Sequence, residues 1–334
     1  MTAVAPEAVN FLDPAVLARI GSLDLLARVV VEGFINGLHR SPHLGSSTDF
    51  AEHRAYMPGD DIRRIDWRLW ARSDRFYVKE FEAETNTNFL AVLDVSRSMR
   101  YRGSGSDATA VSKLEYGSFL AAALSYFSSK QRDRVGLATF DGELVEYVPP
   151  SAKHLERVLQ ALQRACQTPA AAGRQPSAVS PQPSDSPPPS AVRRLPAATL
   201  LPPLKKLSES TRRRCIIALI SDLYEEPDAV MDALAHLHGR GNDIVVFHLL
   251  DRTELEFPFT DASNFIDLES GDRMPVIPDY LRRQYRELVA QHTAALARRT
   301  REARVDYALF DTSKPLDTAL FAYLSSRQRL SRVR

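Results

Sequence analysis

An aspartate and two serines at alternate positions, Asp94, Ser96 and Ser98, are the residues of this sequence best suited to chemistry. They follow an apolar run, residues 89–93, whose lack of polar alternation predicts a strand buried on both faces. A turn after that strand would gather one carboxylate and two hydroxyls. Such oxygen donors suit a hard divalent cation like Mg²⁺, which prefers oxygen ligands and keeps several waters. The alternative interpretation is that the three residues merely cap the following helix.

The elements that would position this loop follow from the alternation of apolar runs with helical patterns. Strands are expected at 89–93, 135–140, 144–148, 214–220, 244–250 and 305–310, and helices at 113–130, 151–165, 227–238 and 279–303. Asp141-Gly142 is a hairpin signal between the second and third strands. Strands joined by right-handed helical crossovers predict an α/β fold, a doubly wound and mostly parallel sheet with helices on both faces.

In such sheets, ligands bind outside the carboxyl ends of the strands, where the strand order reverses. If the order is 3-2-1-4-5-6, the first and fourth strands flank that point. Asp94 follows the first strand and Asp222 follows the fourth, so we expect both carboxylates to face one crevice. This placement favours a metal site over simple capping.

The composition limits the function classes. Of 334 residues, 44% are hydrophobic and 25% charged, which is typical of a globular protein. A net charge of +1 argues against a dedicated nucleic-acid binder, and two cysteines exclude a disulfide framework or a cysteine-rich zinc site. The most apolar window, 25–35, contains Arg28 and Glu32, and the N-terminus lacks a signal-peptide layout. We therefore expect no membrane insertion and a cytoplasmic location.

Two domains are expected. Residues 1–85, with a helix at 12–39, would pack on a main domain at 86–334. Residues 168–196 hold eight prolines and five serines, which predicts a disordered insertion. Residues 254–277 predict a β-rich excursion with a hairpin around Ser270-Gly271.

The Asp94–Ser98 segment resembles the first part of the metal-ion-dependent adhesion site of von Willebrand factor A-like domains. In that family a threonine and a later aspartate complete the site. Asp222 matches the aspartate well, Thr199 matches the threonine loosely because the usual glycines before it are absent, and Thr168 is the fallback. The resemblance implies Mg²⁺ held by the two serines and Thr199, with both aspartates in contact directly or through water, and an open position for a partner's carboxylate.

The preceding segment is similar to the signature of a bacterial family called domain of unknown function 58. The pattern Y-x-P-G-D-x-x-R-x-I-D-W-x-x-x-A-R is matched by Tyr56, Pro58, Gly59, Asp60, Arg63, Ile65, Asp66, Trp67, Ala71 and Arg72. These residues could simply lock the N-terminal segment through ion pairs. The resemblance covers residues 40–334, with the 168–196 insertion as its main departure. It implies a non-enzymatic module that binds an acidic client or partner protein and works with a MoxR-type AAA+ ATPase in chaperone-like complex assembly or maturation.

Two other functions are weighed against this binding module. A Mg²⁺-dependent phosphohydrolase could use Asp94 as its nucleophile. However, Ser96 stands where a second carboxylate would be expected, and the sequence has no P-loop. Nucleic-acid binding could use Arg212–Arg214 and the helix at 279–303, but arginine-rich faces on a neutral protein are usually just solvated. We therefore expect neither an enzyme nor a nucleic-acid partner.

Overall fold

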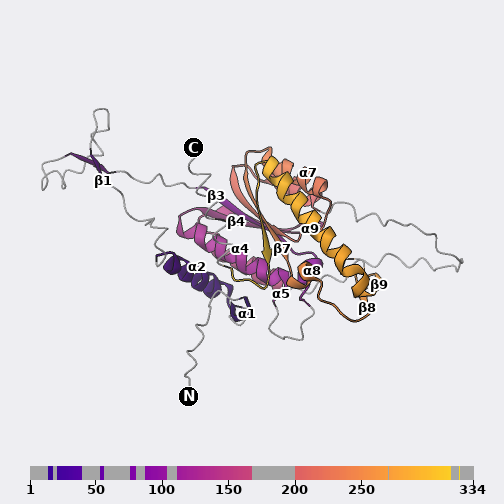
Figure 1. Ribbon diagram of the computed structural model, residues 1–334. Helices are drawn as coiled ribbons and strands as arrows, with labels where there is room; N and C mark the ends of the chain where they lie inside the picture. Colours follow the sequence, from indigo (N-terminus) through magenta and orange to yellow (C-terminus); the bar gives the residue numbers. More distant parts are fainter. Residues whose placement is uncertain are drawn as a thin grey trace, which may run out of the picture. The chain divides into compact units, whose positions relative to one another are not determined.

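The computed structural model describes residues 14–17, 21–39, 53–55, 76–79, 87–103, 111–167, 200–269, 271–316 and 323 (Figure 1). The chain divides into two compact units, residues 1–33 with 87–334, and residues 34–86. In the second unit, β1 (His53–Ala55) pairs antiparallel with β2 (Tyr77–Lys79). The signature residues 56–72 and the 168–196 insertion lie outside the described residues, and the packing of residues 1–85 on the main domain stays a prediction.

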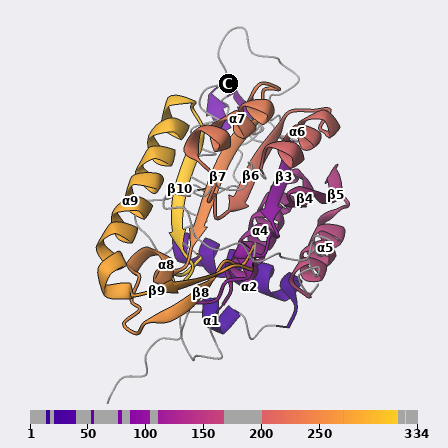
Figure 2. The ribbon, with the colours of Figure 1, turned by 90° about the vertical axis from the view of Figure 1, so that its right-hand side faces the viewer.

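In the described part of the larger unit, six strands form the central sheet. They are β3 (Asn88–Asp94), β4 (Arg134–Asp141), β5 (Glu143–Ser151), β6 (Cys215–Ser221), β7 (Asp243–Leu250) and β10 (Asp306–Asp311). Their order is β10-β7-β6-β3-β4-β5, and every pair is parallel except the β4–β5 hairpin (Figure 2). Counted along the chain, this is the predicted order 3-2-1-4-5-6, with its reversal between β3 and β6.

Helices cover both faces of the sheet. They are α4 (Lys113–Lys130) and α5 (Leu155–Gln167) on one face, and α6 (Leu201–Ser210), α7 (Pro227–His238) and α9 (Pro278–Glu302) on the other (Figure 2). Leu90 and Val92 of β3 join the buried cluster with α6 and α7. The alternate residue Leu93 faces α4, where a Cβ on Gly117 would lie 3.0 Å from its Cδ1. The doubly wound α/β fold is thereby confirmed.

Other elements of the larger unit are α1 (Pro14–Leu17), the 3₁₀ turn η2 (Ser98–Arg100), α8 (Arg252–Glu256), and β8 (Ser263–Ile266) paired antiparallel with β9 (Arg273–Val276). Helix α2 (Leu23–His39) begins in the larger unit and ends in the smaller one, because the two units divide after Gly33. The predicted β-rich stretch 254–277 therefore contains the expected hairpin but begins in a helix, because Asp251 and Glu254 form a capping box that starts α8. No helix in the described part of the chain is both long and apolar enough to cross a bilayer.

Candidate functional site

The carboxyl ends of β3 and β6 lie side by side where the strand order reverses. The two strands pair in parallel up to Leu93 and Ile220, so Asp94 ends one strand and Asp222 follows the other. Both aspartates are buried, with exposed fractions of 6% and 3%. The Ser221 hydroxyl donates to Asp94 Oδ2 at 2.6 Å and ties the two strand ends together. The predicted neighbourhood of the two aspartates is therefore observed.

The loop after β3 gathers the other predicted oxygens. The Val95 N–H still donates to the β4 carbonyl of Phe140 at 2.9 Å, so the loop leaves the sheet at a fixed point. Asp94 Oδ1 then accepts from the Ser96 N–H at 2.9 Å, and the Ser96 and Ser98 hydroxyl oxygens are 3.1 Å apart. One carboxylate and two half-buried hydroxyls thus converge. Thr199 and Thr168 lie outside the described residues.

The ionisation of Asp94 is disfavoured by its surroundings. Burial, and then the negative charge of Asp222, raise the pKa of Asp94 from 3.8 to about 7, although hydrogen bonds from Ser221 and Ser96 act in the opposite direction. The neutral and ionised forms therefore coexist near neutral pH. A cation beside Asp94 would favour the ionised form.

Asp222 has a cation of its own, which sequence reasoning missed. The fully buried ammonium of Lys113 donates to Asp222 Oδ2 and Glu254 Oε1, both at 2.8 Å, and to the Tyr224 hydroxyl at 3.1 Å. Burial alone would lower the pKa of Lys113, but the charges of Asp222 and Glu254 outweigh it and raise that pKa. The ammonium also lies 4.7 Å from the centre of the Tyr224 ring.

Two helix starts bring these charges together. Ser112 and Glu115 form a capping box that starts α4 and makes Lys113 its first residue. The second capping box, at the start of α8, makes Glu254 the third residue of that helix. Both boxes are visible in the sequence. What the sequence does not show is that the two helices start at the same edge of the sheet.

The donor set near Asp94 fits a hard divalent cation. Its groups are all oxygens, and the mutual repulsion of Asp94 and Asp222 is relieved by positive charge. Among the described residues there is no group of three or more histidine, cysteine, aspartate or glutamate side chains suited to a metal. The candidate site instead combines two carboxylates with hydroxyls. Such a set suits an ion that keeps several waters, and Asp222 would share its carboxylate with Lys113.

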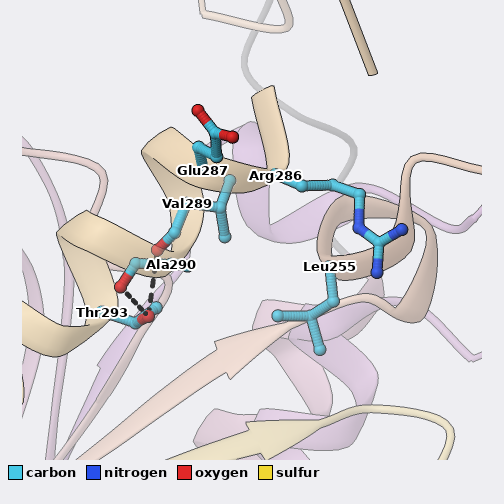
Figure 3. Close-up of a pocket in the computed structure, with 6 residues that line it drawn as sticks. All are labelled: Leu255, Arg286, Glu287, Val289, Ala290 and Thr293. Carbon is cyan, nitrogen blue, oxygen red and sulfur yellow. Dashed lines mark hydrogen bonds between the residues drawn. The ribbon is translucent and has the colours of Figure 1, made fainter. Parts of the chain in front are cut away.

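A pocket elsewhere in the unit does not include these residues. It has a volume of about 420 Å³ and lies between α8 and α9, lined by Leu255, Arg286, Glu287, Val289, Ala290 and Thr293 (Figure 3). The Thr293 hydroxyl donates to the carbonyls of Val289 and Ala290, at 2.9 and 3.1 Å. Its lining offers no converging set of oxygens like that at Asp94, so the strand ends remain the candidate site.

Comparison with known proteins places the chain in a family. Uncharacterized proteins Rv1480 of Mycobacterium tuberculosis (strain H37Rv) and Mb1516 of Mycobacterium bovis are each 25% identical to it over 320 residues, which cover 95% of this chain and 91% of theirs. Two solved structures are similar at 15% identity. They are the conserved hypothetical protein BatB from Bacteroides thetaiotaomicron (TM-score 0.43, covering 74% of this chain and 99% of that one) and an aerotolerance-related membrane protein from Bacteroides fragilis (TM-score 0.42, 70% and 96%). The match to the family described as "protein of unknown function DUF58" spans residues 52–295, more than half of the chain, which therefore belongs to that family.

Proposed function

We propose that the protein is a non-enzymatic, cation-dependent binding module that captures an acidic side chain of a partner protein. One contrast carries the proposal. Within the described part of the chain, the buried ammonium of Lys113 forms ion pairs with Asp222 and Glu254, whereas Asp94 is hydrogen-bonded only to neutral groups. A buried carboxylate beside two hydroxyls, without an ion pair of its own, is best satisfied by a bound cation.

The residues that would hold the ion are hydroxyl and carboxylate ligands. The hydroxyls of Ser96 and Ser98 would bind Mg²⁺ together with Thr199, and Asp94 and Asp222 would contact it directly or through water. The bound ion supplies positive charge and an open position for an incoming oxygen. Because hydroxyl ligands leave more of the ion's charge uncompensated than carboxylates would, a partner carboxylate gains more by binding there.

The rest of the cluster holds these ligands in place. Ser221 and the Ser96 N–H fix the two oxygens of Asp94. Lys113 holds the Asp222 carboxylate in place through a hydrogen bond to Oδ2. The module therefore needs no movement of the sheet to receive an ion. The partner implied by the family resemblance is a MoxR-type AAA+ ATPase, and we propose it as the protein that acts with this module in complex assembly or maturation.

The two other candidate functions gain little support. Lys113 gives its three N–H donors to protein groups, so it offers none to a phosphoryl group beside Asp94. On α9, Arg283 pairs with Glu287 at 3.0 Å and Arg299 pairs with Asp228 at 2.8 Å. Arginines that are paired in this way are less available to a nucleic-acid backbone.

Capture of a purified MoxR-type AAA+ ATPase on the immobilised protein tests the proposal. We expect capture with Mg²⁺, and loss of capture with EDTA or in Asp94→Ala. Asp311→Ala serves as the matched control, because Asp311 also ends a strand of the sheet but lies on its edge strand β10. This control should behave like the wild type. Equal capture by all proteins, with and without Mg²⁺, would contradict a metal-bridged mechanism.

A further inference from the structure

A carboxylate from a distant part of the chain lies against the candidate site. Glu269 Oε1 accepts a hydrogen bond from the Ser98 N–H at 2.7 Å, although the two residues are 171 positions apart. Ser98 is the residue whose hydroxyl pairs with that of Ser96. Glu269 therefore brings a carboxylate to the backbone of the loop whose hydroxyls would bind the ion, within the region where the proposed function expects a partner's carboxylate.

The β8–β9 hairpin is built to present this carboxylate. At its tip, the Asp267 side chain accepts from the Glu269 N–H at 2.9 Å, and the Asp267 carbonyl accepts from the Gly271 N–H at 2.8 Å. These local bonds fix the backbone of Glu269. In Figure 2 the hairpin lies at the end of the sheet where the parallel strands finish, beside α8.

The hairpin packs through aromatic side chains, whereas the side chains at its tip are exposed. One aromatic cluster contains Phe257, Phe259, Phe265 and Tyr285, whose rings meet in stacked, tilted and edge-to-face pairs with ring centres 4.6 to 5.7 Å apart. In contrast, Glu269 is exposed, as are the tip residues Ile266 and Leu268, at 53% and 42%. A tethered side chain of this kind acts as a ligand at high effective concentration and can still be displaced.

We propose that Glu269 is the protein's own carboxylate ligand at the Asp94 site, and that an acidic partner binds by displacing it. The proposal rests on the proposed function, because it assigns the occupant of the same open position. Binding of a partner then requires the hairpin tip to leave. If Glu269 leaves the position about a tenth of the time, the apparent affinity of the site for an external carboxylate is roughly tenfold weaker than without Glu269.

Manganese serves as the probe, because its paramagnetism reports how many exchanging waters it carries. Metal-free wild type, Glu269→Gln and Glu287→Gln are titrated with Mn²⁺, and water-proton relaxation is followed. The control residue Glu287 is a glutamate paired with Arg283 on α9. We expect Glu269→Gln to bind Mn²⁺ more weakly and with higher relaxivity per bound ion, because water takes the vacated position. Added acetate should then lower the relaxivity of Glu269→Gln at roughly one tenth of the concentration that the wild type needs. Glu287→Gln should match the wild type.

Hydrogen exchange at the Ser98 amide gives a second readout that needs no metal. Exchange should be faster in Glu269→Gln than in the wild type and the control. Binding of Mn²⁺ to the wild type but not to Asp94→Ala would support the proposed function. If Glu269→Gln then matches the wild type in relaxivity and acetate response, Glu269 is not a ligand of the ion, and only this further proposal is wrong. If Mn²⁺ binds neither the wild type nor Asp94→Ala, both are overturned.

Discussion

The two aspartates at the strand ends have opposite electrostatic surroundings. Asp222 is neutralised by Lys113, which also joins Glu254 and Tyr224 into a buried, hydrogen-bonded group. Asp94, on the next strand, is equally buried but meets hydroxyls and a backbone N–H, and its pKa is raised to about 7. The Asp222 half of the site consists of Asp222, Lys113, Glu254 and Tyr224, and its charges compensate one another as the chain folds. The Asp94 half consists of Asp94, Ser96, Ser98 and Ser221, and folding leaves the negative charge of the ionised Asp94 uncompensated.

At this edge of the sheet, the Asp222 half therefore has a structural role and the Asp94 half a binding role. A saturated ammonium fixes α4, α8 and the end of β6 relative to one another. The neighbouring carboxylate is then held in place with its charge available to an external cation. Disturbing the first half should cost stability, and disturbing the second should change how stability depends on pH and on metal.

The largest effect is expected from Lys113→Met. The change removes a buried cation and leaves Asp222 and Glu254 facing each other without compensation. Losing one partner of a buried ion pair costs about 3–5 kcal/mol, which chemical denaturation would measure as a lower free energy of unfolding. Lys130→Met, at the other end of the same helix, should cost far less because Lys130 is exposed. If the free energy of unfolding falls equally in both variants, the buried ion pairs of Lys113 do not have the structural role assigned to the Asp222 half.

Asp94→Asn should stabilise the metal-free protein, increasingly so as the pH rises. The folded-state pKa of Asp94, about 7, lies above its usual 3.8, so well below pH 3.8 the residue is neutral in both the folded and the unfolded state and imposes no penalty. As the pH rises from about 4 to about 7, the unfolded chain ionises first and the wild type loses stability. Above that range the loss is on the order of 4 kcal/mol.

Urea denaturation in EDTA between pH 4 and 8 measures this difference. The free energies of unfolding of wild type and Asp94→Asn should diverge across the range, and Asp311→Asn should run parallel to the wild type. Parallel curves for Asp94→Asn would mean that the Asp94 carboxylate is already compensated in the folded protein.

The smallest effect is expected outside both halves. Residues 168–196, which lie outside the described part of the chain, carry eight prolines and five serines. Because the entropy of closing a loop rises slowly with its length, a short Gly-Ser linker in their place should change stability by about 1 kcal/mol or less. Differential scanning calorimetry would measure the change. A melting temperature lowered by tens of degrees would show that the segment supports the domain.

Much of this edge could be predicted from the sequence because its signals are local. Continuous apolar runs marked β3 and β6, and an acidic residue directly follows or ends each of them. The roles of Lys113 and Glu269 could not be predicted in this way. A lysine that opens a helix and a glutamate in a hairpin turn are usually solvated, and here each is defined by contacts more than 100 positions away in the chain. Ser221 is a similar case, since its bond to Asp94 exists only once the two strands pair.

Calorimetric titration of the metal-free protein with Mg²⁺ at pH 8 tests directly whether a cation binds at Asp94. We expect one binding site in the wild type and in Asp311→Ala, and none in Asp94→Ala. At a hundredfold excess over the dissociation constant, the ion should also stabilise the first two proteins by about 3 kcal/mol. Equal binding by all three proteins, or no binding by the wild type, would contradict a cation site at Asp94.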